Sequence, residues 1–104
     1  MSACFIVRAQ VVDAAVKGEF DRWYQDEHLA EAVEAFGAQR AWRGWSEVDA
    51  SVHYAFYEFD DVARVRAIPG SEVLKRLAAG FDRAWGDKVV RSRDVVQVAQ
   101  RIGS

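Results

Sequence analysis

The chain is poor in the residues that build covalent or metal cross-links. Cys4 is its single cysteine, so no disulfide can form within the 104 residues. Together with His28 and His53 it makes three scattered side chains, whereas a structural zinc site normally takes four Cys or His ligands. We therefore expect no metal, and we expect Cys4 to act as a small apolar residue of a strand.

Long apolar runs and an excess of positive charge are also missing. No stretch approaches the ~20 apolar residues that cross a bilayer, and the first apolar run stops at Arg8, too short for a secretory signal. The 16 acidic and 14 basic residues give a net charge of −2, whereas a general nucleic-acid binder needs a basic excess. The sequence thus predicts no membrane partner, no nucleic-acid partner and a cytoplasmic location.

Signatures of nucleotide and redox cofactors are absent as well. The seven glycines are scattered and nowhere form a phosphate-binding loop, and no flavin or nicotinamide fingerprint is present. A haem would have only His28 or His53 as its ligand. We therefore expect that the protein works without a cofactor.

The sequence does contain regular hydrophobic patterns, enough for the strands and helices of one domain. A length of 104 residues with 51% hydrophobic content predicts a single folded domain over residues 1–104. Strands are predicted over 3–12, 39–48, 52–59 and 91–102, and helices over 16–35, 61–67 and 71–85. Gly44 suggests a bulge in the second strand, and Asp60 suggests a cap for the short helix. The order predicts an α+β, ferredoxin-like βαββαβ sandwich, an antiparallel four-stranded sheet with helices on one face.

The first helical segment carries two apolar stripes that do not share one face at about 100° per residue. One stripe is made of Phe20, Trp23, Tyr24 and His28, and the other of Leu29, Ala32, Val33 and Phe36. One straight helix cannot bury both stripes against a single sheet. We therefore predict a bend or break near residues 26–28, followed by a second short helical piece that ends at Gly37.

The predicted third strand is apolar on both of its faces. One face carries Val52, Tyr54, Phe56 and Glu58, and the other carries His53, Ala55, Tyr57 and Phe59. An antiparallel sheet with one face in water should alternate hydrophobic and polar residues. Because two helices cover only one face, we expect a homodimer in which the other sheet face packs on its copy. The alternative is that these aromatic side chains remain half-exposed.

Residues 23–29, Trp-Tyr-Gln-Asp-Glu-His-Leu, resemble the W-Y-x-x-E-H-L signature of bacterial EthD-like proteins of the dimeric α/β-barrel superfamily. Segments 36–40, 53–59 and 99–102 are also similar to that group, although Ala30 and Phe36 stand where many relatives carry proline. The resemblance implies the fold of a dimeric α/β barrel. It leaves the function open, because the superfamily spans cofactor-free monooxygenases, cyclases, isomerases, haem enzymes and proteins with no known activity.

Tyr24 and His28 are the candidate catalytic residues. They are four positions apart, so their side chains can meet on one helical face. An imidazole exchanges a proton near neutral pH, and a phenol beside it can orient the ring or bond an enolate oxygen. The candidate substrate-binding residues are Trp23, Trp42, Tyr57 and Arg40, the aromatic ones suiting a small aromatic or carbonyl compound.

Each candidate also has a structural interpretation. His28 could cap the bent helix by bonding a backbone carbonyl, Arg40 could pair with Glu27, and His53 is expected at the surface. Two functions stay open. The chain is either a cofactor-independent monooxygenase, cyclase or isomerase with His28 as base, or a non-catalytic accessory, binding or stress-related dimer. A cavity beside His28 separates a ligand site from a purely structural dimer.

Overall fold

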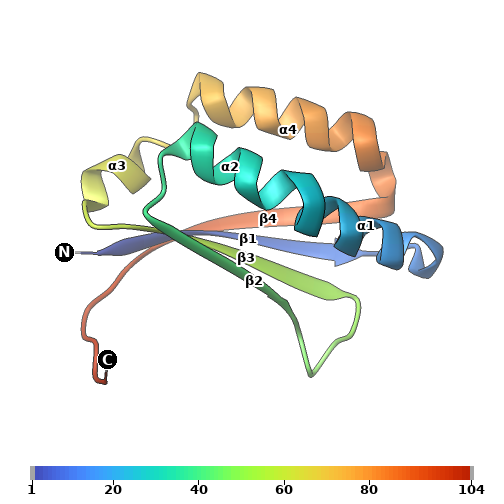
Figure 1. Ribbon diagram of the computed structural model, residues 1–104, viewed down its shortest axis with the longest axis horizontal. Coiled ribbons are helices and arrows are strands. Elements are labelled where there is room, and N and C mark those ends of the chain that lie inside the picture. The colour runs from blue at the N-terminus through green and yellow to red at the C-terminus, as the bar shows by residue number, and fades with distance from the viewer. Residues whose placement is uncertain (1, 104) are drawn as a thin grey trace.

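The computed structural model describes residues 2–103 as a four-stranded antiparallel sheet with its helices on one face (Figure 1). The strands are β1 (Ala3–Val11), β2 (Arg40–Trp45), β3 (Val52–Phe59) and β4 (Val89–Gln97), in the spatial order β2-β3-β1-β4. The helices are α1 (Lys17–Trp23), α2 (Leu29–Phe36), α3 (Val62–Arg66) and α4 (Glu72–Trp85). This arrangement confirms the predicted α+β, ferredoxin-like fold.

Two details of the sheet differ from the sequence-based predictions. Gly44 makes no bulge, because it pairs with Tyr54 in the same register as the rest of β2. The last strand occupies residues 89–97 rather than 91–102. It stops there because β1, its neighbour in the sheet, begins at Ala3, which pairs with Gln97.

The helices α3 and α4 begin at side-chain caps. Ser71 Oγ accepts a hydrogen bond from the backbone N–H of Leu74 at 3.1 Å, which starts α4 where the sequence predicted. The cap of α3 is Asp61 rather than Asp60. Asp61 Oδ1 accepts from the backbone N–H of Ala63 at 2.9 Å, so α3 begins one residue later than expected.

The first helical segment stays continuous but changes its winding where a bend or break was predicted. Between α1 and α2, residues Tyr24–His28 form a π-helical turn. A π-turn closes each hydrogen bond one residue later than an α-turn, so it rotates everything that follows about the helix axis. As a result Phe20, Tyr24, His28 and Ala32 are all buried, and both apolar stripes of the segment pack toward the sheet.

Alternation along the strands gives the sheet a helix-facing side, which holds the core, and an outer side. The core includes Phe5, Phe20, Tyr24, His53, Tyr57 and Phe59, each at most 1% exposed. The expectation that His53 lies at the surface is wrong. His53 shares its strand face with Tyr57, and its ring lies 5.4 Å from Phe20 of α1.

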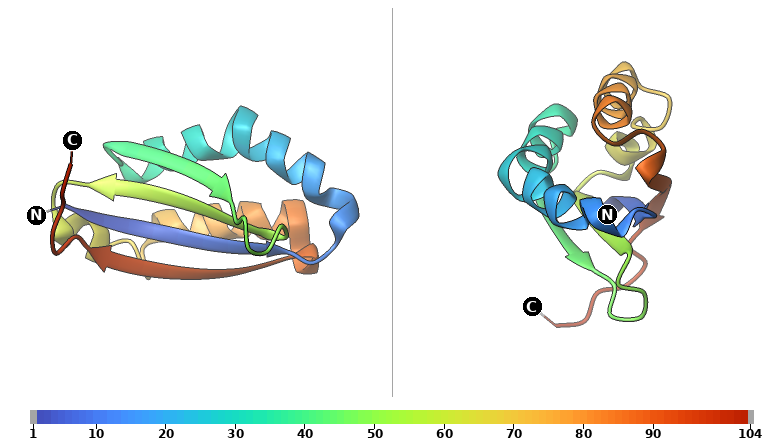
Figure 2. Two further views of the ribbon diagram at one scale, coloured as in Figure 1. Left: turned by 90° about the horizontal axis from the view of Figure 1, so that it is seen from below. Right: turned by 90° about the vertical axis from the view of Figure 1, so that its right-hand side faces the viewer.

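The outer side of the sheet faces away from every helix (Figure 2). The loop between β2 and β3 and the C-terminal tail both extend toward this side, near opposite ends of the sheet (Figure 1). The tail is tied to the sheet through Arg101, which donates to the buried carboxylate of Glu58.

Within residues 2–103 no helix is long and apolar enough to cross a bilayer.

Candidate functional site

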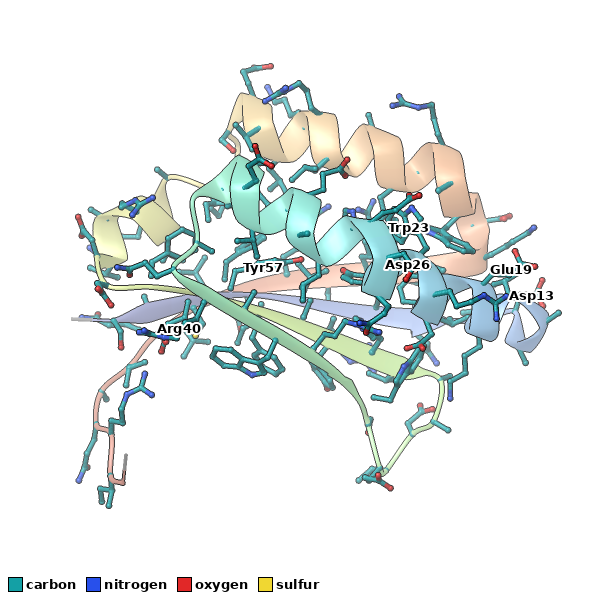
Figure 3. The ribbon with its side chains drawn as sticks, viewed as in Figure 1. Asp13, Glu19, Trp23, Asp26, Arg40 and Tyr57 are labelled. Carbon is teal, nitrogen blue, oxygen red and sulfur yellow. The ribbon has the colours of Figure 1, made fainter. Side chains whose placement is uncertain are left out.

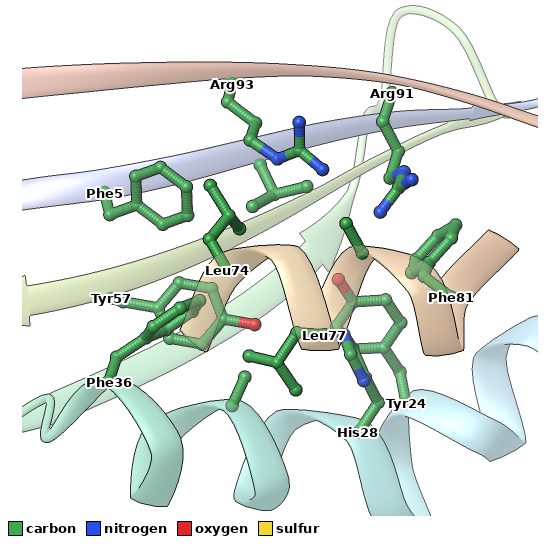
Figure 4. Close-up of a pocket in the computed structure, with 13 residues that line it drawn as sticks. Phe5, Tyr24, His28, Phe36, Tyr57, Leu74, Leu77, Phe81, Arg91 and Arg93 are labelled. Carbon is green, nitrogen blue, oxygen red and sulfur yellow. The ribbon is translucent and has the colours of Figure 1, made fainter. Parts of the chain in front are cut away.

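A small cavity lies between the helix-facing side of the sheet and the helices α2 and α4 (Figure 4). Its volume is about 20 Å³, which is room for about one water molecule. Thirteen residues line it, and the polar ones among them are Tyr24, His28, Tyr57, Arg91 and Arg93. We call this space the inner cavity.

The π-helical turn positions the two candidate catalytic residues at the inner cavity. Tyr24 opens the turn and His28 closes it, and their rings meet edge-to-face with centroids 4.9 Å apart. The imidazole of His28 also stacks on the indole of Trp23, with centroids 4.2 Å apart and ring planes 13° from parallel. The ring of His28 is therefore held by aromatic contacts on two sides.

His28 is buried, and burial is the dominant influence on its proton affinity. Removal from water lowers the pKa of the imidazole, and the positive charge of Arg91 lowers it further. The carboxylate of Glu31 opposes these effects, with Oε1 3.5 Å from Nδ1 of His28, but its side chain is 64% exposed and gives Nδ1 no well-aligned hydrogen bond. The imidazole is consequently neutral at pH 7, the form that accepts a proton.

Two phenols face the same space. The phenols of Tyr24 and Tyr57 both line the inner cavity, and both side chains are buried. Burial raises the pKa of Tyr24 to about 12, and burial raises the pKa of Tyr57 still more. Both phenols therefore stay protonated at neutral pH, so each can donate a hydrogen bond.

The strand β4 supplies two guanidinium groups at the open edge of the sheet (Figure 4). Arg91 is held in place, since it pairs with Asp82 and lies 4.0 Å over the ring of Phe81. Burial lowers the pKa of Arg91, and the positive charge of Arg93 lowers it as well. The side chain of Arg93 has no hydrogen bond or ion pair with any residue in 2–103.

A larger hollow adjoins the inner cavity at this edge. It measures about 390 Å³ and lies between β4 and the start of α4. Phe5, Leu74 and Arg93 line both spaces, so the two adjoin at these side chains. We call it the edge hollow. Its volume lies within the ~300–1,000 Å³ of typical small-molecule pockets.

The structure brings together only some of the predicted site residues. Tyr24, His28 and Tyr57 share the inner cavity, and Trp23 supports His28 from behind without lining it. Figure 3 shows Tyr57 in the layer between the sheet and the helices.

Trp42 and Arg40 do not belong to this site. Both lie on the outer side of the sheet, because they alternate with Ala41 along β2, and Ala41 packs against the core. Trp42 is 45% exposed. Arg40 donates to Glu58 at 2.6 Å, so the predicted pairing of Arg40 with Glu27 is not formed.

Sequence reasoning missed Arg91 and Arg93. A signal was available, because two arginines two residues apart in a strand must point to the same face. The sequence alone does not show which of the two faces of this strand lies under the helices.

The other histidine, His53, does not line the inner cavity. Among residues 2–103 there is no group of three or more Cys, His, Asp or Glu side chains that could hold a metal ion.

Comparisons with known proteins identify the fold. No protein-family model and no curated protein matches the chain. Among solved structures, an EthD family protein from Bacillus halodurans superposes with a TM-score of 0.70 at 13% identity, over 94% of this chain and 99% of the other. HapK from Hahella chejuensis gives 0.66 at 15% identity, over 98% of both chains. SnoaB, a cofactor-independent oxygenase from Streptomyces nogalater, gives 0.64 at 14% identity, over 99% of this chain and 98% of the other. The chain therefore has the EthD-like, ferredoxin-like fold, as its resemblance to that group implied, and at these identities the likeness concerns the fold alone.

Proposed function

We propose that the protein is a cofactor-independent enzyme that removes a proton from a small aromatic or carbonyl compound. The observation that carries the proposal is a buried, neutral imidazole that lines the same cavity as two phenols and two guanidinium groups. A general base must be unprotonated at the working pH and close to the proton it takes. One solved structure with this fold, SnoaB, is described as a cofactor-independent oxygenase, which is consistent with such chemistry.

The proposed first step needs only groups that the chain supplies. A ring nitrogen of His28 accepts a proton from an acidic C–H or O–H of the substrate, and the electron pair of that bond moves onto the substrate as an enolate or phenolate. The O–H of Tyr24 donates to the resulting oxyanion. The charges of Arg91 and Arg93 favour the anion, and the charge of Arg91 also favours the neutral imidazole before the step. Oxygenation, cyclisation and isomerisation can each follow from such an anion.

The sizes of the two spaces support one position for the substrate. The inner cavity of about 20 Å³ admits a water molecule but no aromatic ring. The edge hollow of about 390 Å³ admits a ring, and it adjoins the inner cavity at Phe5, Leu74 and Arg93. We therefore place the body of the substrate in the edge hollow, with its reacting end directed past Leu74 toward Tyr24 and His28.

The test measures proton abstraction directly and needs no natural substrate. Enolisable aromatic ketones such as 1-indanone and 2-tetralone are incubated with the protein in D₂O, and loss of the α-proton signal is followed by NMR. We expect exchange above the buffer rate, and we expect His28→Ala to reduce it by about 10²–10⁴-fold. His53→Gln is the matched control, because His53 is equally buried but does not line the cavity. Equal exchange by the native chain and His28→Ala would refute the catalytic role of His28.

A second candidate function is binding without turnover. The small volume of the inner cavity favours it, because a base that no substrate can reach performs no chemistry. In that case the ketones bind without exchange. Chemical-shift changes at Leu74 with no acceleration of exchange would identify a binding protein rather than an enzyme.

We also propose that a second copy of the chain covers the outer side of the sheet. This side carries a stacked row of aromatic rings, in which Trp42 and Phe56 have centroids 5.5 Å apart and Tyr54 and Phe56 have centroids 6.0 Å apart. A hollow of about 340 Å³ adjoins the row and is lined by Ile6, among others. A row of partly exposed aromatic rings is unusual on a monomer and is satisfied by a two-fold sheet-to-sheet contact.

Light scattering coupled to size-exclusion chromatography tests the dimer. We expect roughly 23 kDa at micromolar concentration, twice the 11.7 kDa of the chain. Trp42→Asp should shift the species toward the monomer. The control is Val48→Asp, which adds the same charge at a residue that is 99% exposed in the loop between β2 and β3. A monomer for the native chain would refute the dimer.

A further inference from the structure

The charged groups that line the inner cavity all have one sign. Its thirteen lining residues include the guanidinium groups of Arg91 and Arg93 and no carboxylate. The nearby carboxylates do not line the cavity, and that of Glu31, 3.5 Å from Nδ1 of His28, belongs to a side chain that is 64% exposed. Asp82 pairs with Arg91 from α4, and Asp94 accepts a hydrogen bond from the backbone N–H of Val95. The cavity therefore presents an excess of positive charge.

Arg91 and Arg93 differ in how their charges are compensated. Arg91 is 15% exposed in its side chain, carries an ion pair with Asp82 and lies over Phe81, so its charge is matched by the protein. Arg93 is exposed, and its side chain has neither a hydrogen bond nor an ion pair with the described residues, although it borders both the inner cavity and the edge hollow. A guanidinium offers five N–H donors in a planar fork that matches a carboxylate.

We propose that the ligand of this site is an anion, a small carboxylate whose charged group is bound by Arg93 at the boundary between the inner cavity and the edge hollow. The inference deepens the proposed function, since it names the class of compound that the same site takes. The carboxylate lies on Arg93, and the apolar remainder of the ligand lies against Phe5 and Leu74. In this pose Tyr24 and His28 lie deeper in the inner cavity than the carboxylate, on the other side of Leu74 from the edge hollow.

The neighbouring groups fit an anionic ligand better than a cationic or neutral one. The like charges of Arg91 and Arg93 repel each other, and an anion between them relieves that repulsion. The same two charges favour the anion that forms when the substrate loses its proton.

The test compares carboxylates with neutral amides of the same shape. Acetate and benzoate are titrated against acetamide and benzamide, and ¹H–¹⁵N spectra report the backbone and arginine side-chain signals. We expect each acid to bind the native chain at least about tenfold more tightly than its amide, with the largest shifts at Arg93 and Leu74. Arg93→Gln should weaken both acids by about tenfold or more and leave the amides unchanged, and Arg93→Lys should retain part of the preference.

Arg66→Gln is the matched control. It removes the same charge from an exposed arginine of α3 that borders neither space. Equal affinity for acids and amides, or equal weakening of the acids by Arg66→Gln and Arg93→Gln, would overturn the anion site. Failure of the proposed catalysis gives a different result. His28→Ala would then leave proton exchange unchanged, while the preference for acids over amides and its loss in Arg93→Gln would persist.

Discussion

His53 makes the stability of the protein depend on pH. Its imidazole is fully buried among aromatic rings, with centroids 4.4 Å from Tyr24 and 5.0 Å from Trp45. Its Nε2 lies 3.3 Å from Nη1 of Arg43, which fixes Nε2 as an acceptor and adds a positive charge nearby. Burial, followed by the charge of Arg43, lowers the pKa of His53 from 6.5 to about 4.

The sign of the effect follows from proton binding. Between about pH 4 and pH 6.5 the unfolded chain protonates this imidazole and the folded chain does not, so stability falls as pH falls through this range. Each tenfold difference in proton affinity is worth about 1.4 kcal/mol. For His53 the free energy of unfolding therefore decreases by about 2 kcal/mol between about pH 8 and about pH 5. That is a large part of the ~5–15 kcal/mol typical of a small domain.

Urea unfolding of native and His53→Gln chains at both pH values measures the effect. Glutamine keeps an acceptor for Arg43 but does not titrate, so the decrease should shrink by about 2 kcal/mol. In the variant His28→Gln, the decrease of about 2 kcal/mol in the free energy of unfolding that His53 causes should remain. An unchanged decrease in His53→Gln, or an NMR titration midpoint of His53 near 6.5, would refute the account.

Three further predictions concern packing, backbone conformation and the C-terminal tail. Phe20→Ala should cost about 3–5 kcal/mol in urea unfolding, because Phe20 is fully buried and contacts rings from α1, α4, β2 and β3; a loss below about 1 kcal/mol would contradict this. Gly37→Ala should cost about 1–2 kcal/mol, because Gly37 ends α2 at φ +72°; unchanged thermal unfolding would show that the left-handed conformation is not required. Glu58→Gln should loosen residues 98–103, because the Glu58 carboxylate bonds both Arg40 and Arg101; ¹⁵N relaxation equal to that of the native tail would contradict it.

The sequence by itself determined the order of elements, because that order depends on local periodicity. Strand β3 and helix α4 match their predicted ranges closely, since alternation and a Ser71 cap act over a few residues. The conflict between two apolar stripes located the change of helical winding near His28, but sequence periodicity alone did not identify it as a π-turn. The i, i+4 spacing of Tyr24 and His28 likewise predicted that their side chains meet, and their rings are in contact.

The tertiary structure decided which face of each strand lies under the helices. Period-two alternation fixes which residues share a face but not which face is covered, because coverage depends on distant segments. For that reason Trp42 was expected at the site and lies outside it, His53 was expected at the surface and lies in the core, and Arg91 and Arg93 were not foreseen. The positive charge at the inner cavity exists only because β4 pairs with β1 beneath α4, and no local pattern encodes that pairing.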